Sequence, residues 1–240
     1  DYDDFCKAHG LKKQAIRTHT YKSGPVENKS VFGKKPDSNS IKTPMEKGKN
    51  KGYTKRTREE LEQTAQQIRE EITQYSDRPS KWSGNIKVDN TLIEDESLGR
   101  KEWSCDISLV DTVDDGVVWH EMLHSCSASY YKPEVYSANE YIEEATVEWL
   151  KQQICAEKNI INLPAYEDKT IVLQALNESF LFGTDMEFAK EIFNVPLPER
   201  YQWLENRVDE RLRQAGASFE DYNDVMGFVE RLKGGRNGGH

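Results

Sequence analysis

The chain has 240 residues, of which 36% are hydrophobic and 31% charged, which suits one domain with a tail or two small domains. No apolar run approaches the roughly 18 residues that a membrane-spanning helix requires, so the sequence predicts no such helix and no membrane partner. Residues 1–60 hold 15 Lys and Arg against 8 Asp and Glu, a balance of +7, and the remaining residues hold 18 against 34, a balance of −16. This division of the net charge of −9 indicates a basic arm on an acidic body.

Residues 1–56 are rich in Lys, Ser, Asn, Gly and Pro and show no sustained apolar period. We expect them to form a flexible arm or linker, because such a composition buries too little surface to offset ordering. A nucleic-acid partner would bind only through this arm, and the scarcity of aromatic residues there favours a solvated linker instead. The expected domain covers residues 57–233, and residues 234–240 form a disordered tail.

The four cysteines contain no C-x-x-C pair and no dense framework. We interpret them as free thiols, which are typical of a reducing compartment. A cytoplasmic or phage-associated location is therefore favoured over secretion.

The first half of the domain combines one long helix with two strands. An apolar stripe of Leu61, Ala65, Ile68 and Ile72 predicts a helix from residue 57 that stops at residues 77–79. Strands are predicted over residues 85–93 and 101–110, with a turn over 94–100. The second strand alternates Trp103, Cys105, Ile107 and Leu109 on one face.

The second half is predicted to be helical. A helix follows residues 111–115, with Thr112 or Asp114 as its N-cap. Further helices are expected over residues 137–159, 167–183, 198–216 and 218–235. Together with the two strands, these helices predict an α+β fold.

One motif carries chemistry: His120, Glu121 and His124 have the spacing H-E-x-x-H within a predicted helix. Histidines at i and i+4 project from one face of a helix and can chelate one ion, and the glutamate then lies beside the attacking water. Zinc prefers nitrogen ligands in tetrahedral geometry. The motif therefore predicts a zinc site with Glu121 as general base.

The third ligand is open from the residues alone. His9, His19 and His240 lie in the expected arm and tail, so a carboxylate from the helix over 137–159 is the better candidate. Glu140, Glu144 and Glu148 share one stripe of that helix, and Glu143 is the rival of Glu144.

The motif HEMLH, 19 intervening residues and then Glu144 within EEATVE resemble the gluzincin metallopeptidases, whose third zinc ligand is a glutamate on the next helix. The resemblance covers residues 100–155 and implies that His120, His124 and Glu144 bind zinc. It also implies that Glu148 orients one of the zinc histidines. The implied fold is a minimal zincin-like domain, with a small sheet, an edge strand before the active-site helix and a mostly helical C-terminal half.

The resemblance further implies how a polypeptide substrate is held and hydrolysed. In zincins an edge strand adds an extended peptide to the sheet, which here assigns substrate contacts to Trp103, Cys105 and Ile107. The family's downstream histidine, which stabilises the oxyanion, has no equivalent in this sequence. A tyrosine or an arginine would replace it, and Tyr136 is the preferred candidate. The other candidates are Tyr130, Tyr131, Arg200 and Tyr201.

Three alternatives stay open. The layout of an arm and a small zincin resembles domains attached to phage head-morphogenesis or toxin-like proteins. The motif and later helix also resemble small regulatory gluzincins that cleave a repressor. A non-catalytic or structural zinc site is the third alternative, although such sites favour four protein ligands and cysteine.

Overall fold

The computed structural model describes residues 54–162 and 164–233. One compact unit begins at Lys55, so the domain starts slightly before the predicted residue 57. The reason is that Lys55 pairs with the carboxylate of Asp111 at 2.9 Å and the backbone N–H of Arg56 donates to the carbonyl of Asp111 at 2.7 Å. The expectations of a flexible arm and tail fall almost wholly outside the described residues.

The first helix forms as its sequence predicts. Helix α3 spans Arg58–Glu71 and is followed by a 3-10 turn, η1, at Ile72–Gln74. Thr57 and Glu60 form a capping box at its start, which satisfies two backbone N–H groups reciprocally. The predicted apolar stripe is buried: Leu61, Ala65, Ile68 and Ile72.

Two helices in the middle of the unit carry the H-E-x-x-H motif and the glutamates that follow it. Helix α4 spans Asp115–Cys126, and Asp114 caps it by accepting from the N–H of Val117 at 3.0 Å. Helix α5 spans Pro133–Lys158, with a proline in its first turn. The 3-10 turn η3, Ala128–Tyr130, joins them. Almost every residue of α4 is buried, so its polar side chains require partners inside the fold.

The described part of the chain contains a three-stranded sheet in the order β1-β3-β2. Strands β1, Ile86–Val88, and β3, Ile107–Leu109, are parallel, with Ile86 opposite Ile107. Strand β2, Gly99–Lys101, runs antiparallel to β3, with Lys101 opposite Ile107. Strand β3 is therefore central, and β2 is the edge strand that packs beside α4.

The predicted strand over 101–110 is wrong in its first half, which is a chain reversal between β2 and β3. The N–H of Glu102 donates to the carbonyl of Asp106 at 2.8 Å, and Cys105 takes a left-handed conformation with φ of 67°. The carboxylate of Asp106 accepts from the hydroxyl of Ser83 at 2.7 Å, which holds the turn against a neighbouring loop. The alternation of apolar residues over 103–109 therefore predicted a longer strand than the structure contains.

The predicted strand over 85–93 is also too long. After β1 the chain forms a 3-10 helix, η2, at Asn90–Asp95. The carboxylate of Asp89 caps it by accepting from the backbone N–H of Thr91 at 3.0 Å and from its hydroxyl at 2.6 Å. This local hydrogen bonding competes with strand pairing.

The C-terminal half is helical, as predicted, with one helix that the apolar pattern did not reveal. Helix α7, which was not expected, begins with a capping box between Thr184 and Glu187. Gly216 ends α8 in the left-handed conformation at φ of 65°, which favours glycine. The elements are α6 (Glu167–Phe180), α7 (Asp185–Asn194), η4 (Leu197–Glu199), α8 (Arg200–Ala215), α9 (Phe219–Glu230) and η5 (Arg231–Lys233).

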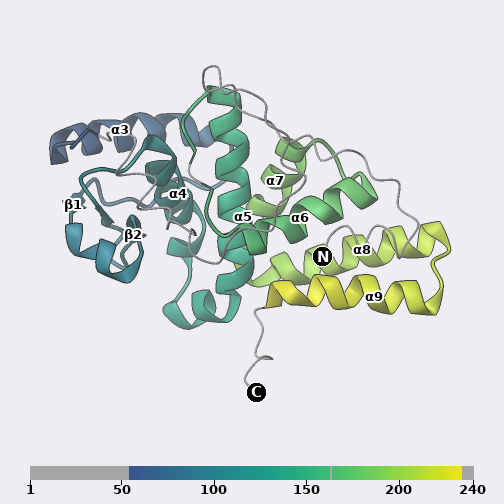
Figure 1. Ribbon diagram of the computed structural model, residues 1–240. Coiled ribbons are helices and arrows are strands. Elements are labelled where there is room, and N and C mark those ends of the chain that lie inside the picture. The colour runs from purple at the N-terminus through teal and green to yellow at the C-terminus, as the bar shows by residue number, and fades with distance from the viewer. Residues whose placement is uncertain (1–53, 163, 234–240) are drawn as a thin grey trace, which may run out of the picture. The chain divides into compact units, whose positions relative to one another are not determined.

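Within this unit α5 is the central element. It lies between α3, α4 and the sheet on one side and α6 to α9 on the other (Figure 1). The fold is α+β, as predicted, with a small mixed sheet and a mostly helical C-terminal half. No described helix is long and apolar enough to cross a membrane. The α4–α5 contact is where the motif histidines meet the candidate glutamates.

Acid should weaken the turn that joins β2 to β3. The hydroxyl of Ser83 and the ammonium of Lys87, 3.0 Å away, lower the pKa of Asp106 from 3.8 to about 2. A lowered pKa contributes stability above the ordinary value, and this contribution is lost as pH falls from about 4 towards about 2. We expect Asp106→Asn to show a smaller loss of unfolding free energy between pH 7 and pH 3 than the unaltered protein.

Urea unfolding at the two pH values measures this difference. Asp95→Asn is the control, because it removes one exposed negative charge near the same sheet. Equal losses in Asp106→Asn and the unaltered protein would contradict the assignment.

Candidate metal centre

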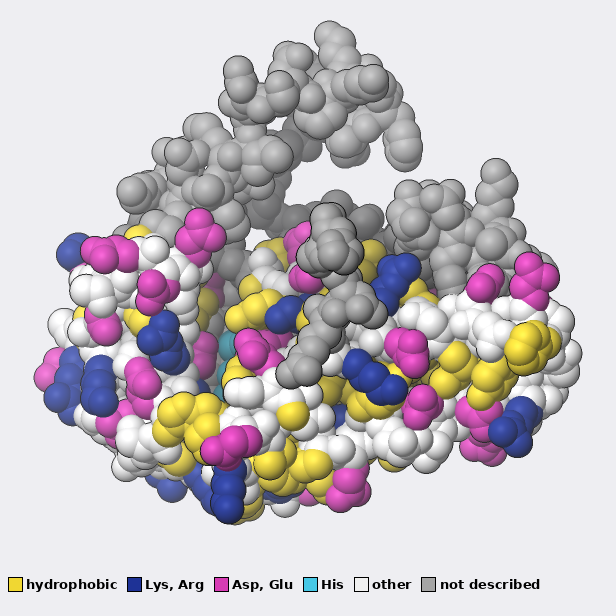
Figure 2. Space-filling view, turned by 90° about the horizontal axis from the view of Figure 1, so that it is seen from below, with side chains coloured by type: hydrophobic (Ala, Val, Ile, Leu, Met, Phe, Trp, Pro, Cys, Tyr) yellow, Lys and Arg dark blue, Asp and Glu magenta, His cyan; other side chains and the backbone are white. Residues whose placement is uncertain are grey.

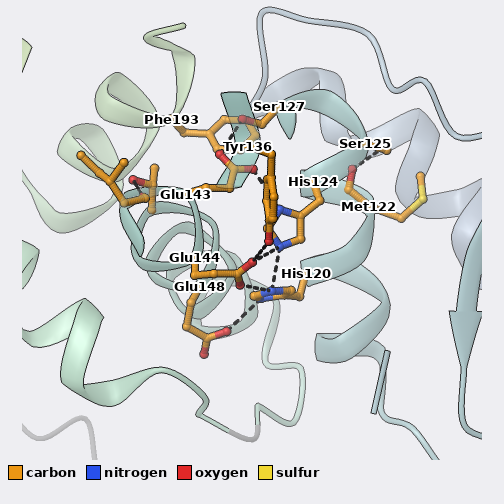
Figure 3. A network of polar contacts seen from close by, with 12 residues as sticks. His120, Met122, His124, Ser125, Ser127, Tyr136, Glu143, Glu144, Glu148 and Phe193 are labelled. Carbon is orange, nitrogen blue, oxygen red and sulfur yellow. Dashed lines mark hydrogen bonds and ion pairs between the residues drawn. The ribbon is translucent and has the colours of Figure 1, made fainter. Parts of the chain in front are cut away.

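Helices α4 and α5 present the side chains of the site to one another (Figure 3). His120 and His124 lie one turn apart on α4, and Glu144 faces them from α5. The Nε2 atoms of the two histidines are 3.0 Å apart. The carboxylate oxygens of Glu144 lie 3.2 Å from Nε2 of His120 and 3.3 Å from Nε2 of His124. Each residue therefore directs one potential ligand atom to a common point, with all three atoms within 4.8 Å of one another.

Two further glutamates of α5 hold the opposite nitrogen of each imidazole. Nδ1 of His120 lies 3.0 Å from the carboxylate of Glu148, and Nδ1 of His124 lies 2.9 Å from that of Glu143. Such contacts fix the tautomer and the orientation of a metal-binding histidine. An ionised carboxylate only accepts hydrogen bonds, so each Nδ1 carries a hydrogen, and an imidazole held in this way and deprotonated at Nε2 would offer the Nε2 lone pair to a metal.

Both supporting carboxylates are surrounded by donors, which keeps them ionised. Glu148 is paired with Lys151 at 2.8 Å and accepts from the side-chain amide of Gln152 at 3.1 Å and from the backbone N–H of Ala165 at 3.0 Å. Burial alone would raise the pKa of Glu148, but His120 and Lys151 lower it.

Glu143 belongs to a buried ion pair behind His124. Its carboxylate accepts from the guanidinium of Arg200 and from the hydroxyl of Ser127, the latter at 2.9 Å. Arg200 also donates to Ser127 at 2.6 Å and to the carbonyls of Phe193 and Val195 at 2.7 and 3.1 Å. Burial alone would raise the pKa of Glu143, but Arg200 and His124 bring it down to about 2. The C-terminal helices thereby support a histidine of α4.

These contacts decide between the two candidates for the third position. Glu144 directs its carboxylate to both Nε2 atoms, whereas Glu143 lies on the Nδ1 side of His124 and engages Arg200. Glu148 lies on the Nδ1 side of His120, which is the place that the family resemblance implies. Glu140, on the same stripe, lines the neighbouring cavity.

Glu121 lies in a cavity of about 310 Å³ that is also lined by His120, His124 and Glu144. The hollow opens on one face of the molecule, where a histidine side chain is visible at its base (Figure 2). Burial raises the pKa of Glu121 above the ordinary carboxyl value. Strand β2 forms one wall of this cavity, and a Cβ at Gly99 would lie 3.0 Å from Cγ and Oε1 of Glu121. A glycine there gives Glu121 its room.

Three aromatic side chains border the same cavity: Trp103, Tyr136 and Tyr166. The hydroxyl of Tyr136 donates to Glu144 at 2.7 Å, and its ring packs edge-on against Trp103 with centroids 5.6 Å apart. Tyr166 stacks on His120 with centroids 5.8 Å apart. Trp103 is 53% exposed and Tyr166 41%, so both offer apolar surface at the rim.

The structure separates the other candidates from the cavity. Of the residues assigned to substrate contact, Trp103 borders the cavity, whereas Ile107 is buried in the central strand and Cys105 lies in the turn. The expectation of an edge strand over 103–109 is therefore wrong, because β3 is central and β2 is the edge strand that lines the cavity. Among the other candidates for the oxyanion role, Tyr130 donates to the carbonyl of Pro79 at 2.6 Å and Arg200 is fully buried in its ion pair. Tyr131 and Tyr201 do not line the cavity.

Three residues of this region were not predicted from the sequence: Lys101 and Tyr166, which line the cavity, and Arg200, which pairs with Glu143. Lys101 lies just before the segment of alternating apolar residues. Because the predicted strand boundary was wrong, the position of Lys101 on β2 was not predicted. Tyr166 lies in a loop with φ of 50°, and no spacing rule places such a residue over His120.

No protein-family model matches the chain, and no curated protein or solved structure matches it either.

Removing Arg200 should destabilise the fold strongly. Arg200→Met leaves Glu143 charged and buried without its counter-ion, which costs about 3–5 kcal/mol of unfolding free energy. Adding Glu143→Gln removes the stranded charge and should recover part of the loss. Urea unfolding measures both variants.

Arg213→Met is the matched control. Arg213 pairs with Asp209 at 3.0 Å on the exposed face of α8, and such exposed pairs contribute little to stability. A loss in Arg200→Met as small as that in Arg213→Met would contradict a supporting role for the buried pair.

Proposed function

We propose that this chain is a zinc-dependent peptidase in which His120, His124 and Glu144 hold the metal and Glu121 is the general base. The observation that carries the proposal is the convergence of two Nε2 atoms and a carboxylate within hydrogen-bond distance of one another. Groups so placed require positive charge between them, which either protons on the histidines or a metal ion would supply.

The residues fit a zinc ion in their chemistry. Two imidazole nitrogens and one carboxylate are a typical donor set of a catalytic zinc site, which leaves the fourth position for water or substrate. Although burial by itself lowers the pKa of His124, Glu144 and Glu143 raise it well above the ordinary value, which expresses the same demand for positive charge. When bound, zinc supplies Lewis acidity that polarises a carbonyl and makes water a better nucleophile.

The surrounding residues would perform the remaining steps of peptide hydrolysis. Glu121 accepts the proton of the attacking water and passes it to the leaving amine. Tyr136 lies within reach of Glu144 and can donate its hydroxyl hydrogen to the oxygen that becomes negative during attack. The exposed edge of β2 can add an extended peptide to the sheet.

A structural zinc site is less well supported. Such sites are usually closed by four protein ligands and favour cysteine. Among the described residues the metal-ligand group contains three members, and neither Cys105 nor Cys126 belongs to it. An open cavity beside the group and a glutamate inside that cavity suit turnover.

The general base is tested by Glu121→Gln. We expect this variant to keep zinc but to lose hydrolysis of a randomised peptide mixture by at least about a hundredfold, because a proton acceptor contributes about 10²–10⁴ in rate. Mass spectrometry detects the cleavage products, and elemental analysis gives the zinc content.

Glu140→Gln is the matched control, since Glu140 lines the same cavity from α5 and is exposed. Equal cleavage by Glu121→Gln and the unaltered protein would exclude Glu121 as the base. Zinc binding with no cleavage by the unaltered protein would favour the structural alternative.

The hydroxyl of Tyr136 is tested by Tyr136→Phe. If it stabilises the developing oxyanion, kcat should fall by about 10²-fold while KM and zinc content change little. Tyr141→Phe, which removes a hydroxyl from an outer position of the same helix, should leave kcat unchanged. A fall in zinc affinity with unchanged kcat at saturating zinc would show that Tyr136 only orients Glu144.

A further inference from the structure

One cationic side chain that lines the cavity has no role in the proposed hydrolysis. Lys101, on the edge strand β2, lines the cavity together with Trp103 and Tyr136. Its Nζ atom is buried and has no hydrogen-bond partner among the described residues. An ammonium group has three hydrogens to donate, so this one leaves its full capacity unused inside the fold.

The position of Lys101 on its strand places it beside the substrate edge. Gly99, two residues earlier, faces Glu121, and side chains two residues apart share one face of a strand. Arg100, between them, instead pairs with Asp95 at 3.3 Å. Lys101 therefore lies on the strand that would bind a peptide and lines the cavity where that peptide would be cleaved.

Among the described residues, no acidic side chain lies within hydrogen-bond distance of the Lys101 ammonium. The ring of Trp103 lies 4.6 Å from Nζ and covers it on one side. Glu102 accepts the hydroxyl of Ser108 at 2.9 Å, and Glu143 is paired with Arg200. Burial lowers the pKa of Lys101, and the neighbouring acidic groups offset this lowering only in part: Cys105, Glu143, Glu121 and Glu102.

We propose that Lys101 forms a specificity subsite for a substrate carboxylate, so that the preferred peptides carry a glutamate or aspartate where they pair with β2. A carboxylate satisfies both the charge and the donors of the ammonium, whereas a backbone carbonyl or an amide satisfies one donor and leaves the charge. The aromatic side chains of Trp103 and Tyr136 supply apolar walls for the methylene groups of the acidic side chain. This inference rests on the proposed peptidase function for its catalytic consequence, although carboxylate binding itself does not.

The test uses two randomised octapeptide pools that differ only at one fixed central residue, which is glutamate in one pool and glutamine in the other. The unaltered zinc-loaded protein should cleave the glutamate pool at least about tenfold faster, because glutamine lacks the charge that strengthens a hydrogen bond to the ammonium. In Lys101→Met, which keeps most of the length of the side chain, this ratio should fall below about twofold through loss of glutamate cleavage alone. Lys81→Met, in which a lysine over the ring of Tyr130 is removed, should keep the ratio.

A parallel binding measurement separates failure of the subsite from failure of the peptidase. Calorimetry records the affinity of both pools for zinc-loaded Glu121→Gln protein, with and without Lys101→Met. Tighter glutamate binding that depends on Lys101, without cleavage by the unaltered protein, would support the subsite and remove the peptidase. Cleavage of both pools at equal rates would overturn the subsite and retain the peptidase. An equal loss on both pools in Lys101→Met would also overturn it, because Lys101 would then act on the peptide group itself.

Discussion

The close approach of the Nε2 atoms of His120 and His124 to the carboxylate of Glu144 is the constraint on which the site depends. These groups are buried, and each approaches the others within 3.0–3.3 Å. The carboxylate requires positive charge at their common point, which protons on the imidazoles or a bound cation would supply. Two helices, α4 and α5, must keep their register for the three groups to meet.

The supporting contacts explain why this register is held. Glu148 and Glu143 each bind the Nδ1 atom of one histidine, and each is held in turn by a cation, Lys151 and Arg200 respectively. Negative and positive side chains therefore alternate outward from each histidine, one series through Glu148 and Lys151 and the other through Glu143 and Arg200. The branch through Arg200 reaches the carbonyls of Phe193 and Val195, so the α7–α8 connection is tied to a histidine of α4. The helical C-terminal half thus contributes to the geometry of the site as well as to the core.

Much of this site could be predicted from local spacing. The i, i+4 histidines and the stripe of Glu140, Glu144 and Glu148 depend on helical periodicity alone, and the family resemblance implied separate roles for Glu144 and Glu148. Periodicity could not choose between Glu143 and Glu144 by itself, because the choice depends on Arg200, 57 residues beyond Glu143. The start of helix α7 could have been predicted from the capping box at Thr184, although the apolar stripe of this helix is short.

The sheet was the least predictable part, and the reason is physical. Strands of three residues carry little periodic signal, and their boundaries are set by side-chain hydrogen bonds of Asp89 and Asp106. Alternation over residues 103–109 therefore indicated a long strand where the chain turns. For this reason the predicted substrate edge was placed on β3, which is central, and Lys101 of the edge strand β2 was not recognised.

The zinc affinity of Glu144→Gln, compared with Glu140→Gln, tests the central claim most directly. Competition with a chromophoric chelator gives the zinc dissociation constant, and circular dichroism establishes that each variant is folded. The account predicts one zinc per chain in the unaltered protein, unchanged affinity in Glu140→Gln and a loss of at least about a hundredfold in Glu144→Gln, since a ligand should contribute no less than the groups that orient ligands. Equal zinc affinity in all three proteins, or no zinc in any of them, would contradict the claim that these three groups form a metal site.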